Sequence, residues 1–188
     1  MFREKAPKTF QWTYKILENE EHRSTPYSTL YWGIKKYYEY YSELQFNTLL
    51  EFENTGGLDH VYAYYQKRAL KYGFSKELTD WTMFSLTRTA MRANNYKTFD
   101  TLVRAFEKTD FLSRLRVHRS SSIAEFYAKN KNYAKAITLL KQLAMNHPKS
   151  ERPLKGLLDC YNTLENTKMS AIYLKKLKEL QKKNTLRK

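Results

Sequence analysis

The chain contains few of the residues that usually build disulfides, metal centres or nucleotide sites. Cys160 is the single cysteine among 188 residues, which excludes an internal disulfide and a zinc site built on cysteines. It falls in a helical pattern between Leu158 and Tyr161, so we expect a buried structural thiol. The five glycines form no phosphate-binding loop, and no serine is flanked by glycines as in G-x-S-x-G. We therefore expect no cofactor and no metal, and the chain lacks the nucleophile of a serine hydrolase.

Long apolar runs are also missing. No stretch approaches the ~20 residues that a membrane-spanning helix needs, and the polar start MFREKAPK has no apolar signal-peptide core. We expect a soluble chain without a membrane span. The compartment stays open, because in a longer precursor a targeting signal would lie upstream.

Positive charge is in excess. Lysine and arginine outnumber aspartate and glutamate by 34 to 19, a net charge of +15, and there are sixteen tyrosines. Basic and aromatic residues together are typical of nucleic-acid binding. Here, however, the basic residues are spread over every helical segment, as in 35–38 and 175–183, and most tyrosines recur at apolar-face spacing. We assign the charge to solvated helix faces, with an acidic partner or nucleic acid as the alternatives.

The periodicity changes along the chain. Large apolar residues alternate in 10–17, which predicts one strand, Phe10–Leu17. From Pro26 to Ser42 the apolar spacing becomes three and four, which predicts a helix. The Gly56–Gly57 pair marks a turn or linker, so we predict two domains, 1–53 and 58–188. In the second domain, helices are predicted over 58–72, 75–93, 97–108, 113–129, 133–146, 150–164 and 167–183.

Residues at the ends of these segments support the helices. Gly73 is expected to close the first of them, and Ser75 is expected to open the next with an acidic first turn. Ser150 and Thr167 stand where N-caps are expected.

The second domain repeats itself. NNYKTFDTLVRAF at 94–106 superposes on KNYAKAITLLKQL at 131–143, which separates Tyr96 from Tyr133 by 133 − 96 = 37 residues. The next copy begins at Thr167, 167 − 133 = 34 residues later. A period near 34 residues with two helices per unit resembles the tetratricopeptide repeat. The resemblance implies an all-α, tetratricopeptide-like helix-pair array.

The clearest unit places small and apolar residues at inner positions and ends at Pro148. Ala124 and Ala136 are expected to face each other where its two helices cross. In the preceding unit Phe111 stands where proline is expected, and the last unit has a lysine-rich outer face that suits a terminal cap. The predicted inner positions are Leu86, Ala90, Phe99, Val103, Phe106, Ile123, Ala124, Tyr127, Ala136, Leu140, Leu143, Leu157, Leu158, Tyr161, Ser170, Leu174 and Leu177.

The segment from Glu20 to Tyr38 carries a second resemblance. Glu-Glu-His-Arg-Ser at 20–24 and Leu-Tyr-Trp-Gly-Ile at 30–34 resemble the end of the α/β-hydrolase domain of esterases such as esterase D and siderophore-ester hydrolases. Members have a final strand, a Glu-x-His-x-Ser loop and a closing helix. Trp32 and Ile34 depart from the usual acidic residue and leucine. Bacterial members often carry helical repeats after the hydrolase domain.

The resemblance implies a catalytic role for His22 in a complete parent enzyme. There it would take the proton from the serine hydroxyl and return it to the leaving alkoxide, with a carboxylate holding its tautomer. The chain order Ser, Asp or Glu, His puts this histidine last, so it can stand alone in a C-terminal piece. The competing interpretation is an exposed loop histidine. His60, His118 and His147 show no metal-ligand spacing.

Two functions are expected from these patterns. The first is the C-terminal part of a serine esterase, a strand-loop-helix remnant that is inactive alone, followed by a repeat domain that packs on the hydrolase or docks a protein or peptide. The second is a free-standing repeat scaffold that binds a protein or peptide. In addition, the apolar strip of 10–17 is expected to pair with a second copy as a homodimer.

Overall fold

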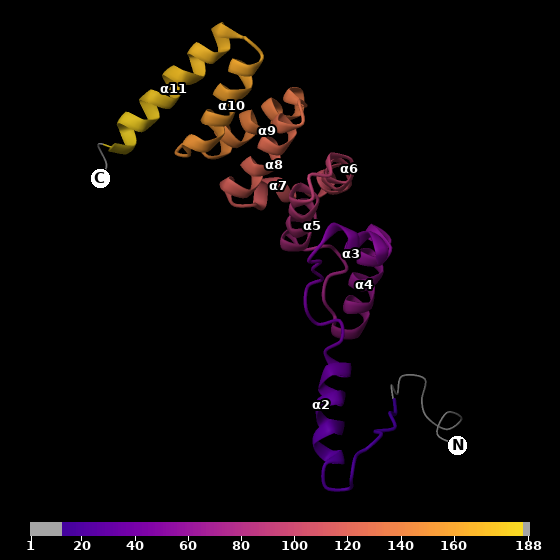
Figure 1. The fold of residues 1–188 in the computed structure, drawn as a ribbon. Coiled ribbons are helices and arrows are strands. Elements are labelled where there is room, and N and C mark those ends of the chain that lie inside the picture. Colours follow the sequence, from indigo (N-terminus) through magenta and orange to yellow (C-terminus); the bar gives the residue numbers. More distant parts are fainter. Residues whose placement is uncertain (1–12, 186–188) are drawn as a thin grey trace. The chain divides into compact units, whose positions relative to one another are not determined.

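The computed structural model describes residues 13–185, which belong to two compact units, Met1–Ser42 and Glu43–Lys188. Its regular structure within these residues is helical, with ten α-helices, one 3-10 helix and no strand (Figure 1). The all-α class is therefore confirmed for the described part of the chain. The boundary between the units lies after Ser42, ahead of the Gly56–Gly57 pair.

Over the described residues 13–42, the first unit contains one helix, α2 (Thr25–Tyr37), with Pro26 in its first turn. The helix ends earlier than Ser42, because the Tyr38 N–H closes it on the Ile34 carbonyl at 3.0 Å. The predicted strand is not confirmed: Thr13–Leu17 has no strand conformation, and 10–12 lie outside the described residues. A strand must pair its N–H and C=O groups with a neighbour, and the described residues contain no second strand.

The second unit opens with α3 (Leu49–Asn54) and α4 (Gly57–Tyr72). Sequence periodicity did not predict α3. It starts at the Thr-x-x-Glu pattern typical of a capping box: the Thr48 hydroxyl accepts the Glu51 N–H at 3.1 Å, and the Glu51 carboxylate accepts the N–H of Asn47, the residue before the cap, at 2.9 Å. The predicted closure at Gly73 is confirmed, since this residue is left-handed at φ 71° and its N–H bonds to the Ala69 carbonyl.

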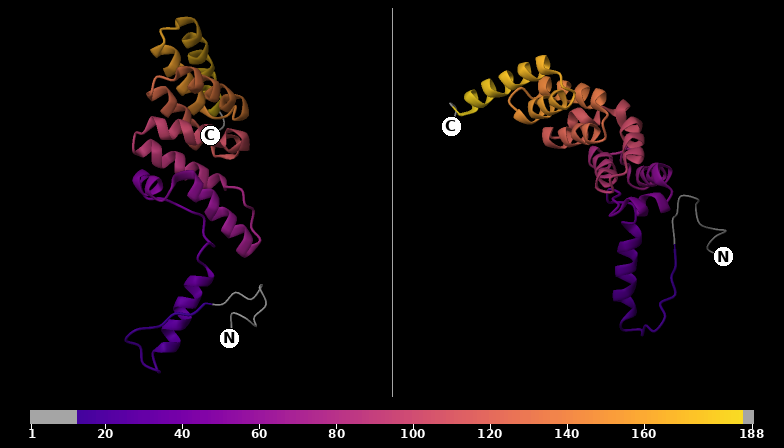
Figure 2. Two further views of the ribbon diagram at one scale, coloured as in Figure 1. Left: turned by 90° about the vertical axis from the view of Figure 1, so that its right-hand side faces the viewer. Right: turned by 45° about the horizontal axis from the view of Figure 1, so that its top comes forward.

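Three helix pairs follow: α5 (Asp80–Arg92) with α6 (Tyr96–Phe106), α8 (Val117–Lys129) with α9 (Tyr133–Asn146), and α10 (Glu151–Thr163) with α11 (Thr167–Thr185). A 3-10 turn, η1 (Glu107–Thr109), and the short α7 (Phe111–Arg114) connect the first pair to the second. Figure 2 shows the pairs following one another along the second unit.

Two predicted helix bounds were wrong. The helix expected from Ser75 begins at Asp80, because the Ser75 hydroxyl accepts the Glu77 N–H in a local turn and Thr79 provides the cap, accepting the Thr82 N–H at 3.2 Å. The helix expected over 113–129 is two helices, α7 and α8, separated by extended backbone at Leu115.

The three pairs share one turn. A left-handed residue, Asn94, Lys131 or Glu165 (φ 50°, 62° and 53°), precedes an asparagine N-cap in each pair. Asn95, Asn132 and Asn166 accept the N–H three residues ahead at 3.0, 3.3 and 3.1 Å. Their own N–H groups bond back to the carbonyls of Ala90, Tyr127 and Tyr161 at 3.0, 2.9 and 2.9 Å. The same turn geometry thus recurs in each of the three pairs.

One predicted N-cap residue, Thr167, was wrong by one position. Asn166, rather than Thr167, caps α11. Ser150 does stand at the N-cap position of α10, although its side chain makes no capping hydrogen bond.

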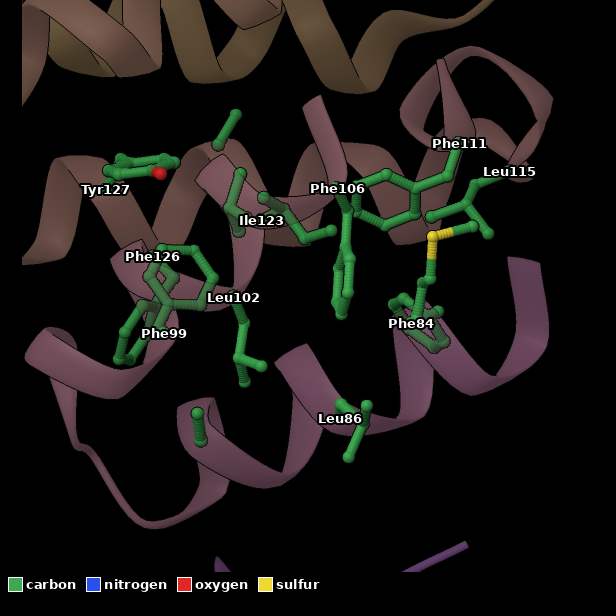
Figure 3. Close-up of a cluster of buried hydrophobic side chains, with 14 of the residues drawn as sticks. Phe84, Leu86, Phe99, Leu102, Phe106, Phe111, Leu115, Ile123, Phe126 and Tyr127 are labelled. Carbon is green, nitrogen blue, oxygen red and sulfur yellow. The ribbon is translucent and has the colours of Figure 1, made fainter. Parts of the chain in front are cut away.

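The core of the second unit is continuous from α3 to α11. Phe99 of α6 lies fully buried against two rings of α8, with centroids 4.6 Å from Phe126 and 4.9 Å from Tyr127 (Figure 3). Phe111, at the position expected for proline, is fully buried edge-on to Phe106. Cys160 is buried, as predicted. Leu174 was predicted to face inward but is 40% exposed, because α11 has no following pair within the described residues.

The crossing of α8 and α9 gives a stability prediction. Ala124 and Ala136 are both fully buried in the core. Ala136→Leu should reduce the free energy of unfolding by ~1–3 kcal/mol, because extra methylenes overpack a close helix crossing. Ala134→Leu, on the exposed side of the same helix, is the control and should change stability little. Urea denaturation measures both, and equal midpoints would contradict the assigned register.

Candidate functional site

His22 lies in a tight turn that leads into α2. The Glu21 carbonyl accepts the N–H groups of Ser24 and Thr25 at 3.0 and 2.9 Å, and the Thr25 hydroxyl at 2.7 Å. In return, the Glu21 N–H donates to the Ser24 hydroxyl at 3.0 Å. These bonds fix the backbone on both sides of His22 and leave its side chain exposed. The turn therefore presents the imidazole without enclosing it.

The carboxylate of Glu20, two residues before His22, is held by a hydrogen bond to α2. It accepts this hydrogen bond from the Ser28 hydroxyl, one turn into α2. Hydrogen bonds from Ser24 and Ser28 lower the pKa of Glu20 below its ordinary value. This carboxylate is thus held ionised and directed at α2.

No catalytic partner meets His22 within the described part of the chain. Over 13–185, no side chain is hydrogen bonded to its imidazole, so neither a nucleophile nor an orienting acid is assembled there. The His22 side chain is exposed, so a group from elsewhere can reach it. Its catalytic role remains a prediction.

Helix α2 exposes the apolar side chains that follow this turn. None of its residues is buried, and Leu30 and Ile34 are 64% and 50% exposed. Tyr27, Tyr31 and Tyr37 are exposed as well. The sequence showed the apolar spacing of this helix. The structure places the face in solvent, where contiguous apolar surface of this kind marks an interaction site.

Paired charges tie successive helices of the second unit together. Arg114 of α7 binds Asp80 of α5 through both oxygens, at 2.9 and 2.7 Å. Arg152 of α10 binds Glu125 of α8 in the same two-point manner, at 2.8 and 2.7 Å. Two-point arginine–carboxylate pairs fix geometry better than single contacts. Sequence reasoning missed them, because each pair joins residues that are far apart in the chain.

Asp100 of α6 joins the first helix pair to the second. It accepts the Tyr127 hydroxyl at 2.9 Å and the Lys135 ammonium at 3.3 Å, and it pairs with Arg104. Burial raises the pKa of Asp100, but these hydrogen bonds outweigh it and lower the pKa. Burial, and then the bond to Asp100, raise the pKa of Tyr127 far above its ordinary value, so the phenol stays protonated and donating.

A groove runs between α8 and α10. Its α8 side is lined by Ala128 and Lys129. Its α10 side is lined by Gly156, Asp159, Cys160 and Thr163. Burial raises the pKa of the Cys160 thiol. A raised pKa keeps Cys160 in its protonated, less nucleophilic form.

The described residues contain neither a metal-binding cluster nor a membrane-spanning helix. Over 13–185, no cluster of three or more His, Cys, Asp or Glu side chains is arranged to hold a metal ion. In the same range, no helix combines the length and the apolar character required to cross a bilayer. No protein family, curated protein or solved structure matches this chain.

Proposed function

We propose that the chain is the C-terminal part of a longer serine esterase. In this proposal 13–42 complete an α/β-hydrolase domain and His22 acts there as general base and then general acid. The second unit is a tetratricopeptide-type accessory domain that binds protein. The chain alone, which lacks nucleophile and oxyanion hole, is inactive.

One observation carries the hydrolase part of the proposal: α2 has an apolar face and buries none of it. In the α/β-hydrolase architecture, helices cover both faces of a sheet. A closing helix separated from its sheet would show such a face to solvent. The turn before α2, which holds the backbone around His22 and leaves the imidazole accessible, supports the same assignment.

The repeat part is supported by the shared turn. The same left-handed residue, asparagine cap and backward hydrogen bond occur in all three pairs. Stacked helix pairs of this kind present extended binding surfaces. The same observation favours the alternative function, a free-standing scaffold that binds a protein or peptide.

Extending the reading frame upstream of Met1 separates the two functions. The esterase proposal expects upstream strands, helices and a G-x-S-x-G, and expects the extended protein to hydrolyse p-nitrophenyl butyrate while the 188-residue chain does not. If the extended frame lacks a nucleophile motif and the extended protein does not hydrolyse the ester, the free-standing binding scaffold is the function that remains.

The isolated chain should associate through its N-terminal segment. Tyr14 and Ile16 are exposed in the described part of the apolar strip, and the remainder of the strip lies outside the described residues. Deleting 1–18 should convert a dimer to a monomer, because the strip loses the apolar area that pairing covers. Light scattering measures the mass, and an intact chain that is monomeric at high concentration would refute the pairing.

A further inference from the structure

A second groove lies between α9 and α11, over the start of α10. Its volume is about 500 Å³. Apolar side chains form it: Ala144 and Met145 from α9, Pro148 and Leu154 near the start of α10, and Tyr173 and Leu180 from α11. Met145 is 73% exposed at its edge. Neither the hydrolase assignment nor the groove between α8 and α10 makes use of this surface.

The rim of this groove is basic. Lys141 of α9 and Lys176 and Lys183 of α11 line it, against one acid, Glu179, a local charge of 3 − 1 = +2. None of these lysines forms an ion pair with a carboxylate in the described part of the chain. Lys141 hydrogen bonds to the Tyr161 side chain, with its ammonium 5.9 Å from the ring centroid, and Lys176 lies 5.3 Å from the Tyr173 centroid. Since no carboxylate of the described residues neutralises these three lysines, their charges can attract anionic groups of a partner.

The walls of the groove are held in place. Tyr161 of α10 stacks on Tyr173 of α11, with centroids 5.5 Å apart and planes within 10°. Further along α11, the amides of Gln181 and Asn184 donate to the Glu151 carboxylate at 3.1 and 3.3 Å. Because these two contacts hold α10 and α11 together, little conformational entropy is lost at the groove when a ligand binds. It is formed without a ligand.

We propose that this groove binds an acidic amphipathic helix of a protein partner. The apolar floor between two helices fits the apolar stripe of a third helix, the helix-in-groove mode of recognition. The three lysines along the rim match glutamates or aspartates that flank such a stripe, and steer its approach. Basic and apolar side chains together select a peptide of this type over an uncharged one.

The test uses the intact chain and two fluorescein-labelled helical peptides. Both carry leucines on one face, and the other face is glutamate in one peptide and lysine in the other. Fluorescence polarisation should show binding of the glutamate peptide only, weakened by added salt. Reversing the rim charges (K141E, K176E, K183E) should weaken that binding by about tenfold or more and admit the lysine peptide.

Two further variants complete the test. The matched control, K76E with K97E and K108E, changes three exposed lysines away from the groove and should bind the glutamate peptide like the wild type. Met145→Glu, at an exposed position, should weaken binding through loss of the apolar contact. Equal binding of both peptides, unchanged binding by the rim variant, or tighter rim-dependent binding of a single-stranded oligonucleotide would overturn the proposal.

Discussion

If the chain belongs to a longer esterase, as proposed, His22→Ala should reduce kcat of that esterase by about 10⁴-fold or more, with little change in stability. The large effect is expected because the imidazole moves a proton in both halves of the reaction, and no other group of the turn takes its place. The fold should be unaffected, since the side chain is exposed and has no hydrogen bond within the described residues. Hydrolysis of p-nitrophenyl butyrate and a thermal melt measure the two quantities.

The matched control is His118→Ala, which removes an exposed histidine from α8 in the second unit. It should leave kcat unchanged. If the His22→Ala variant keeps near-wild-type turnover, His22 is not a catalytic residue. Turnover by the 188-residue chain that disappears in its own His22→Ala variant would contradict the assignment of the nucleophile to upstream residues.

Phe99→Ala should lower the free energy of unfolding by about 3–5 kcal/mol. The ring is fully buried and contacts Phe126 and Tyr127 of the next helix pair, so its loss removes apolar burial and leaves a cavity between two pairs. This aromatic cluster, drawn in Figure 3, provides buried apolar contact between α6 and α8. Urea denaturation followed by circular dichroism measures the change.

Leu70→Ala is the control for this substitution. Leu70 lies in α4 of the same unit but is 88% exposed, so truncating it should cost little. If the two variants unfold at the same urea concentration, the pairs are not joined through Phe99. A loss confined to the helices before α8 would show that the pairs unfold separately, contrary to a continuous core.

Periodicity predicted the long helices well. The bounds of α9 agree with the predicted 133–146, and those of α4, α6, α10 and α11 differ from the prediction by at most two residues at either end. These helices have strong apolar spacing and clear stops, such as Gly73. The repeat alignment also identified the turn region, although the asparagine caps at its centre were not recognised as such.

Short elements, and elements that depend on a neighbouring segment, were not predicted correctly from the sequence. α3 has six residues, too few for a 3.6-residue period to show, yet the Thr48 and Glu51 capping box was present as a signal. The strand predicted over 10–17 depends on a neighbouring strand, which alternation in one segment cannot provide. The lysine-rimmed groove combines residues of α9, α10 and α11, so only their packing brings it together.

The most direct test of the esterase assignment is labelling of the extended protein with a fluorophosphonate probe, followed by mass spectrometry of its peptides. We expect one modified serine, in an upstream G-x-S-x-G, and a labelling rate that falls by orders of magnitude in the His22→Ala variant because the serine loses its base. No modified serine, or equal labelling rates in the wild type and the His22→Ala variant, would contradict it.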